Sequence, residues 1–298
     1  MNPPDRAGAG DYLRSLPLYA LPHHLLSRLM LAATRVRTPL IKNALIRWFV
    51  GRYRVDMDDA VVNDPLDYPD FNAFFTRALR PDRRPLPATP EAVISPVDGA
   101  VSQLGDIRDG RLFQAKGRDF SLVELLGGDA ARAAPFMGGS FATLYLSPRD
   151  YHRIHMPFPG RLLETTYVPG RLFSVAPHTT RTIPNLFARN ERIAALFDTA
   201  AGPMAVVLVG AIFVACIETV WAGVVTPPRG RRVVVHDYRT EERPAVQLDR
   251  GDELGRFNMG STVILLFGPQ RVRWQDSLGP GSTLCIGQQI AALETAGP

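Results

Sequence analysis

MAVVLVGAIFVACIETVWAG, residues 204–223, contains the longest apolar run of the sequence, from Val206 to Ile217. The run is rich in Val and Ile, which favour β-strands. It is too short to span a bilayer, which takes about 20 apolar residues. The N-terminus, MNPPDRAGAGDYL, lacks the charged start and apolar core of a secretory signal. We therefore predict a buried strand here, in a protein that is soluble or peripheral to a membrane.

Further short apolar runs alternate with turn-forming residues from about residue 92 onward, and we interpret them as strands. The 26 prolines and 25 glycines also favour turns and short strands over long helices. A segment at 184–197, PNLFARNERIAALF, fits either a helix or a loop over a site. The remaining predicted strands lie in VISPVDGAVSQLGDI (93–107), FATLYLS (141–147), GRLLETTYVPG (160–170) and STVILLFG (261–268).

Two amphipathic helices are predicted before this β-rich region. Residues 23–37 have one apolar face, and Thr38-Pro39 then marks a second helix start, with Thr as N-cap and Pro at the first position. We expect an α+β fold with a small helical module at residues 1–60 and a β-rich core at residues 61–298. The apolar faces contain Leu25, Leu26, Leu29, Met30 and Ala33 in the first helix, and Leu40, Ile41, Ala44, Leu45, Trp48 and Phe49 in the second.

The positive charge is concentrated in this N-terminal segment. Residues 1–54 hold nine basic and two acidic side chains, a net charge of +7, whereas the whole chain has +5, so that residues 55–298 carry −2. Basic amphipathic helices that include a Trp suit an anionic membrane surface. The alternative is that both apolar faces pack on the core. A charge confined to one end of the chain does not favour a nucleic-acid partner.

The cysteine content argues against a disulfide framework. Only Cys216 and Cys285 are present, without metal-ligand spacing, so a reducing compartment is the default expectation.

The segment SPRDYHRIHMP (147–157) holds two histidines three residues apart, His152 and His155. Ser147, Pro148 and Asp150 have the pattern of a helix N-terminus. A short helical turn would place both histidines on one side, whereas a strand would place them on opposite faces. They could be general acid/base groups or metal ligands, and no third ligand of obvious spacing supports a metal.

Two turn-like motifs complete the set of candidate residues. Asp98 precedes a glycine in SPVDGAV (95–101), and Gly260 and Ser261 stand at the entrance to the apolar strand in NMGSTVILLF (258–267). Each motif taken alone indicates only a turn.

Together these motifs resemble the phosphatidylserine decarboxylase family. FNMGSTVILLF is similar to the family's Gly-Ser-Thr processing site, and the segments with the two histidines and Asp98 resemble its histidine and aspartate motifs. Met259 stands where the family usually has Leu, a change that keeps volume and apolarity. Further matches in the same order are FNAFFTRALRPDRRPL (71–86), VPGRLFSV (168–175), NLFARNER (185–192) and IETVWAG (217–223).

The resemblance implies an enzyme that matures by cutting itself between Gly260 and Ser261. The products would be a β chain of residues 1–260 and an α chain of residues 261–298 that begins with a pyruvoyl group made from Ser261. This covalent cofactor would form a Schiff base with phosphatidylserine, and loss of CO2 would give phosphatidylethanolamine. Pyridoxal phosphate, the common alternative, needs a lysine, and neither Lys42 nor Lys116 lies in a recognisable motif for it.

The resemblance also implies roles for the individual residues. His155 would be the base that activates Ser261 and Asp98 would orient it, while His152 would assist decarboxylation. The sequence alone leaves open an exchange of roles between the two histidines. No metal is expected. The resemblance further implies a homodimer of processed units, peripheral to the cytoplasmic face of the cell membrane.

Two other functions compete with this interpretation. A serine hydrolase would use Asp98, His155 and Ser261 in an intact chain, but the string NMGSTV lacks the G-x-S-x-G elbow. A non-catalytic lipid-binding module would dock through the basic helices without cleavage or CO2 release.

Overall fold

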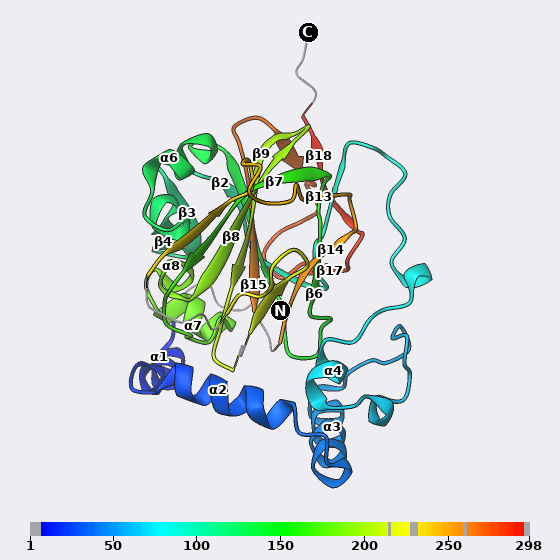
Figure 1. Cartoon of the computed structure of the whole chain (residues 1–298). Coiled ribbons are helices and arrows are strands. Elements are labelled where there is room, and N and C mark those ends of the chain that lie inside the picture. Colours follow the sequence, from blue (N-terminus) through cyan, green and yellow to red (C-terminus); the bar gives the residue numbers. More distant parts are fainter. Residues whose placement is uncertain (1–6, 214–215, 227–231, 259–260, 295–298) are drawn as a thin grey trace.

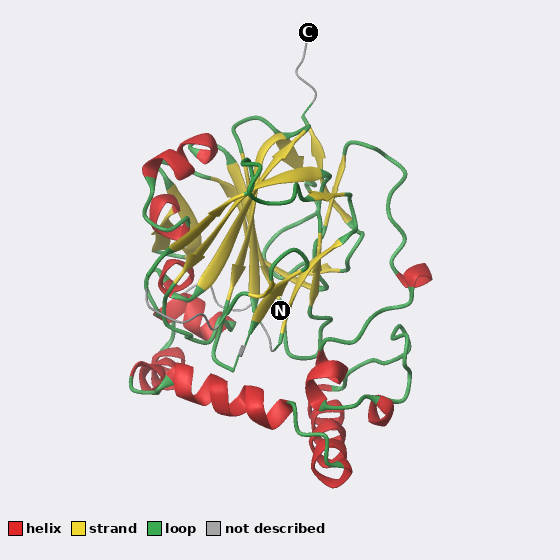
Figure 2. Ribbon diagram, in the orientation of Figure 1, coloured by secondary structure: helices red, strands yellow, loops and turns green. Residues whose placement is uncertain are grey.

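A computed structural model describes residues 7–213, 216–226, 232–258 and 261–294. A nine-stranded sheet with antiparallel pairing dominates these residues, and Figure 2 shows the strands at the centre with the helices around them. The predicted α+β class is confirmed. The sheet order is β12 (Val234–Asp237), β7 (Gly160–Val168), β8 (Arg192–Thr199), β9 (Gly202–Val209), β15 (Thr262–Phe267), β5 (Ser140–Tyr145), β2 (Gly99–Asp106) and β17 (Thr283–Leu284), with β13 (Gln247–Leu248) also paired to β7.

The strand after Ser261 lies in the middle of this sheet. β15 reads TVILLF, and all six of its residues are buried, as expected for a strand covered on both faces. It pairs with β5 on one side and with β9 on the other along its whole length. The residue before β15 is thereby fixed at the end of the most enclosed strand.

Smaller sheets flank the large one. A four-stranded sheet in the order β11 (Gly223–Val224), β10 (Ile217–Thr219), β14 (Glu253–Phe257) and β6 (Arg153–His155) carries His155 at its edge. The other two sheets consist of β1 (Ala92–Ile94), β18 (Gln289–Leu293) and β16 (Val272–Trp274), and of β3 (Arg111–Ala115) with β4 (Arg118–Ser121).

Two local predictions need correction. The apolar run predicted as one strand is divided, because β9 ends at Val209 and the Gly210 N–H donates to the Glu191 carbonyl (2.9 Å). The segment 184–197 is neither a continuous helix nor a loop, because its last residues form β8 from Arg192 onward. In both places pairing between distant strands determined the outcome, which local patterns do not contain.

Helices gather mainly at the edges of the sheets. α1 (Ala9–Ser15), the 3-10 turn η1 (Leu16–Tyr19), α2 (His23–Thr34) and α3 (Pro39–Tyr53) form what we call the helical base, residues 9–53, which lies at one end of the molecule (Figure 1). The other helical elements are α4 (Phe71–Phe75), α5 (Leu122–Leu125), α6 (Ala130–Ala133), α7 (Pro177–Thr182) and α8 (Leu186–Arg189), with short 3-10 turns η2 (Pro65–Asp67), η3 (Pro81–Arg83) and η4 (Ala134–Phe136).

The helical base is attached to the rest of the chain at both ends. Near α1, Asp11 forms an ion pair with Arg181 of α7 (2.9 Å). At the other end, Phe49 of α3 packs on Phe71 and Phe75 of α4 in a small apolar cluster. This cluster includes residues on both sides of position 60, and the division at that residue stays a prediction.

Candidate active site

Ser261 is fully buried at the head of β15. Its carbonyl accepts a hydrogen bond from the Leu146 N–H (3.0 Å), which ties it to the end of β5. Its hydroxyl finds no hydrogen-bond partner among the described residues. A buried hydroxyl without a partner costs about 1–3 kcal/mol, and a native protein retains such a group for a reason such as chemistry. Gly260, the other residue of the predicted cleavage site, and Met259 lie outside the described residues.

His152 is the first of two neutral histidines at the site. It is buried, with its ring against Phe75 (4.1 Å between centroids). Its Nδ1 lies 2.7 Å from the Asp150 carbonyl, which can only accept, so Nδ1 carries the proton. Burial lowers the pKa of His152 to about 3. Its Nε2 therefore holds a free lone pair, and no described residue occupies it.

His155, on β6, has a different environment. Its Nδ1–H donates to the Gly251 carbonyl (2.7 Å), and the Tyr151 hydroxyl donates to its Nε2 (3.1 Å). Burial lowers the pKa of His155 as well. The ring is neutral like that of His152, but its lone pair is already engaged.

Asp98 is held by a guanidinium group. Arg84 donates to both oxygens of its carboxylate (2.7 and 3.2 Å), and the Ile286 N–H donates to Oδ1 (2.7 Å). Arg84 also pairs with Asp59 (2.6 Å). Asp98 and Tyr151 border the same polar cavity of about 240 Å³. Across the described ranges, no hydrogen bond joins Asp98 to His155 or His155 to Ser261.

The expected helical turn after Ser147 extends only as far as Asp150. The Asp150 carboxylate accepts from the Ser147 N–H (2.7 Å), and the chain then becomes extended as β6 pairs with β14. Residues three apart on an extended chain point to opposite sides. His152 accordingly lies against Phe75, and His155 lies beside Tyr151.

An apolar chamber of about 200 Å³ borders this site. Leu146 lines the chamber, and its N–H donates to the Ser261 carbonyl. Phe75 also lines the chamber, and its ring packs on His152. Tyr151, Arg84 and the chamber residues have no role that the sequence predicts. Some of them stand within the quoted motifs or next to the histidines, but nothing in these positions indicates their contacts. Other residues that line the chamber include Phe49, Tyr53, Tyr145, Pro148, Ser174 and Val175.

The low pKa of His152 predicts acid sensitivity. Unfolding returns this ring to a pKa near 6.5, so protons favour the unfolded state and stability falls as pH drops from about 6.5 toward 3. Between pH 7 and 5 this one group costs about 2 kcal/mol. The His152→Gln protein and its parent are compared in a Ser261→Ala background, which should keep the chain uncut, and urea unfolding measures their stability. Between pH 7 and 5, the free energy of unfolding of His152→Gln should fall by about 2 kcal/mol less than that of the protein with His152.

Ala32, an exposed residue of α2, provides the control for this experiment. Ala32→Gln changes no titratable group and should leave the pH dependence of unfolding unchanged. An equal pH dependence in the His152→Gln protein and its parent would contradict the neutral, buried state assigned to His152.

In the part of the chain that the structure describes, no three His, Cys, Asp or Glu side chains gather as a metal site. Nor is any helix among these residues both long and apolar enough to cross a bilayer.

Comparison with known proteins identifies close relatives. The family model described as phosphatidylserine decarboxylase matches residues 71–292, and a second one, described as PSD, matches residues 13–54. A phosphatidylserine decarboxylase proenzyme of Stutzerimonas stutzeri is 58% identical over 288 residues, which cover 96% of this chain and 97% of that one. Proenzymes of the same name from Pseudomonas putida (60% over 274 residues; 92% and 95% covered) and Pseudomonas fluorescens (59% over 277; 93% and 96%) are similarly related.

Proposed function

The chain belongs to the phosphatidylserine decarboxylase family, and from this premise we propose that it cuts itself before Ser261 and converts phosphatidylserine to phosphatidylethanolamine and CO2. The observation that carries the proposal is the buried hydroxyl of Ser261 at the head of β15, which has no hydrogen-bond partner among the described residues. Ser261 lies where the sequence predicts the processing site, and Leu146, its hydrogen-bond partner, lines an apolar chamber.

Self-cleavage needs only groups of this chain and water. The Ser261 Oγ attacks the Gly260 carbonyl carbon and gives its proton to a base, and the C–N bond breaks to leave an ester. Removal of the Ser261 α-proton then expels the Gly260 carboxylate and leaves dehydroalanine. Hydrolysis of that residue releases ammonia and leaves a pyruvoyl group. The chain ends at Gly260 in one product and begins at position 261 in the other.

A pyruvoyl group at position 261 would supply a ketone that withdraws electrons from the carboxyl-bearing carbon of the substrate. The site fits such a group, because the residue at the head of β15 is buried and its hydrogen-bond partner Leu146 lines a chamber with apolar walls. Exclusion of water protects a reactive carbonyl and strengthens the electrostatic interactions within the site.

We assign proton transfer during decarboxylation to His152, since its Nε2 has no partner among the described residues and its ring packs on Phe75, which lines the chamber. We assign the activation of Ser261 to His155, oriented by Asp98. That second assignment requires a rearrangement of side chains. The hydrogen bond from Tyr151 to the His155 Nε2 must break, and so must the hydrogen bonds from Arg84 to the Asp98 carboxylate.

The two product chains would remain together without a covalent link. β15 belongs to the shorter chain and lies between β5 and β9 of the longer one. β16, β17 and β18 also belong to the shorter chain and pair with one another or with β1 and β2. Separation would therefore require unfolding of the large sheet.

The activity is tested by release of labelled CO2 from phosphatidylserine carrying its label in the serine carboxyl group. We expect release by the purified protein, and its suppression by phenylhydrazine, which captures ketones. Release that is insensitive to a carbonyl reagent would exclude the pyruvoyl group, and absence of release would exclude the decarboxylase.

We also propose that the helical base attaches the enzyme to an anionic membrane. The buried side chains of α2 are polar, namely His23, Ser27 and Thr34, whereas Leu25 and Leu29 are more than half exposed. This reverses the usual pattern of a helix packed on a core, and exposed apolar groups of this kind suit a lipid surface. Other exposed apolar residues of the helical base are Leu13, Leu16, Leu40, Ile41 and Trp48.

The charge of the helical base also supports its attachment to an anionic membrane. Seven arginines of the helical base and its flank are exposed, and each basic residue near an anionic leaflet contributes roughly 1 kcal/mol. The substrate is itself anionic, so membranes rich in it would recruit the protein. The cytoplasmic location and the homodimer remain predictions. The seven are Arg14, Arg28, Arg35, Arg37, Arg47, Arg52 and Arg54.

Serine substitutions at the exposed apolar positions should separate membrane binding from maturation. We expect Leu25→Ser/Leu29→Ser/Trp48→Ser to bind anionic vesicles at least about tenfold more weakly, since burying each large apolar side chain contributes about 1.5–3 kcal/mol. Self-cleavage should stay complete, because these side chains point to solvent. Vesicle co-sedimentation across a salt series measures the binding.

The control places serine at two exposed apolar residues outside the helical base, Val224 of β11 and Val234 of β12 (Val224→Ser/Val234→Ser). Substitution is preferable to deletion of the helical base, because α3 supplies Phe49 to the cluster that contains Phe75. Vesicle binding of the triple variant at the wild-type level would show that another surface meets the membrane.

A further inference from the structure

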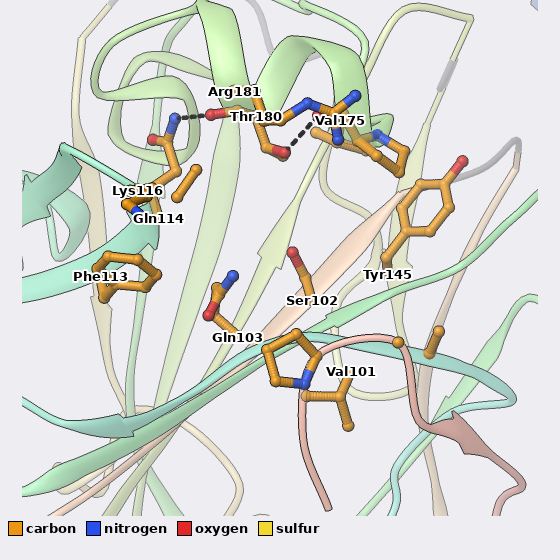
Figure 3. A pocket seen from close by; sticks show the side chains of 15 residues that line it. Val101, Ser102, Gln103, Phe113, Gln114, Lys116, Tyr145, Val175, Thr180 and Arg181 are labelled. Carbon is orange, nitrogen blue, oxygen red and sulfur yellow. Dashed lines mark hydrogen bonds between the residues drawn. The ribbon is translucent and has the colours of Figure 1, made fainter. Parts of the chain in front are cut away.

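A second, larger cavity of about 590 Å³ lies between β2, β3 and the segment that leads into α7 (Figure 3). Its volume falls within the range of small-molecule sites. Ser102 and Gln103 of β2 point into it from one side, and Thr180 and Arg181 of α7 border the other. We call it the Lys116 cavity after the lysine that lines it.

The Lys116 cavity offers one uncompensated positive charge. Its lining contains two cations, Lys116 and Arg181, and no carboxylate. Arg181 is neutralised by Asp11 through two hydrogen bonds (2.9 and 3.0 Å). Lys116 forms no ion pair or side-chain hydrogen bond with any residue in the described ranges. The nearby Asp119 is already paired with Arg111 (2.7 Å). A bound anion would therefore meet an available ammonium group.

Most of the remaining lining is apolar. Val101, Ala115, Val175 and Pro177 contribute to it, and Phe113, 45% exposed, presents its ring at the rim. Among the described residues, the side chains of Ser102 and Gln103 have no hydrogen-bond partner, which leaves them available to a ligand. Apolar walls combined with one cation and a few free polar groups suit an anionic amphiphile.

The Lys116 cavity adjoins the apolar chamber beside the candidate active site. Tyr145 and Val175 line both this cavity and the apolar chamber. Tyr145 is also paired across the sheet with Thr262, the residue that follows Ser261. A ligand that reaches from position 261 to Lys116 would therefore pass Tyr145, the side chain shared by the two cavities.

We propose that the Lys116 cavity binds the phosphodiester and one acyl chain of the lipid substrate, with the ammonium group of Lys116 facing the phosphate. This inference rests on the proposed function, to which it adds the place of the non-reacting part of the substrate. Lys116 acts in substrate binding and takes no part in the bond-breaking steps.

The first test removes the charge of Lys116. For dioctanoyl phosphatidylserine in detergent, Lys116→Met should raise KM about tenfold or more, as expected for loss of a charge-assisted hydrogen bond, with kcat near that of the wild type. Self-cleavage should be complete, and Lys116→Arg should restore most of the affinity. Arg273→Met removes an exposed cation whose one ion pair within the described ranges is with Asp276, and it should leave KM unchanged.

The second test fills the apolar part of the cavity. Ser102→Trp should raise KM for dioctanoyl phosphatidylserine and have little effect on glycerophosphoserine, which has the phosphodiester but no acyl chains. Lys116→Met should raise KM for both substrates. This contrast assigns the phosphate to Lys116 and the chain to the walls, and either variant alone tests its own half of the assignment.

Several results would overturn the inference. They are a wild-type KM in both variants, an equal rise of KM in Arg273→Met, or equal effects of Ser102→Trp on both substrates. A wild-type protein that releases no CO2 from any phosphatidylserine would instead refute the proposed function itself, so the two failures are distinguishable.

Discussion

Replacing Ser261 with alanine should leave the chain uncut and abolish decarboxylation. The hydroxyl is the nucleophile that opens the peptide bond and also the source of the ketone, so its loss removes both steps at once. Alanine fits the space, because the Ser261 Oγ makes no hydrogen bond with the described residues and the backbone carbonyl retains its bond from Leu146. A denaturing gel and CO2 release together measure the two losses.

Ser140 provides a matched control for this substitution. Like that of Ser261, its hydroxyl is buried and has no hydrogen-bond partner among the described residues. Ser140 lies at the far end of β5, where it pairs with Phe267 of β15. Ser140→Ala should be cut and active like the wild type. A Ser261→Ala protein that is still cleaved, or that releases CO2, is incompatible with the mechanism.

The second large effect separates the two histidines. His152→Ala should be cut normally but release CO2 about 10²–10⁴-fold more slowly, the usual contribution of a positioned acid or base. His155→Ala should remain mostly uncut, since loss of a relay base typically costs several orders of magnitude. Asp98→Asn should behave like His155→Ala. Rates of cleavage after in vitro synthesis, followed by turnover per cleaved chain, distinguish these effects.

The opposite pattern would have an equally definite meaning. An uncut His152→Ala protein would assign activation of Ser261 to the histidine whose Nε2 is free in the structure. Normal cleavage of His155→Ala would leave the Tyr151–His155 hydrogen bond as a structural contact.

Much of the fold could be predicted from local sequence patterns. The two N-terminal helices were predicted at 23–37 and from Thr38 onward, and the structure places α2 at His23–Thr34 and α3 at Pro39–Tyr53. The apolar run after Ser261 is the central strand β15. Helix caps and unbroken apolar runs are local signals, so they remain visible without knowledge of tertiary contacts.

The strand order could not be predicted in this way. β15 lies between β9 and β5, strands that are far from each other in sequence, and only the tertiary structure brings them together. The same pairing of distant segments overrode the helical start signal at Ser147, because β6 pairs with β14.

The candidate site was predicted by residue but not by geometry. The sequence identified Asp98, His152, His155 and Ser261 as a group. It did not indicate that Arg84 holds the Asp98 carboxylate or that Tyr151 occupies the His155 lone pair. Such contacts depend on side-chain directions at separate elements, which spacing along the chain does not specify.

Intact-mass measurement of the purified wild-type protein under denaturing conditions tests the central claim most directly. We expect two polypeptides, one ending at Gly260 and one beginning at position 261. The smaller should weigh about 17 mass units less than residues 261–298 with an unmodified N-terminal serine, because conversion of that serine to a pyruvoyl group amounts to a net loss of ammonia. It should also resist Edman degradation. A single, active chain of 298 residues would contradict the account.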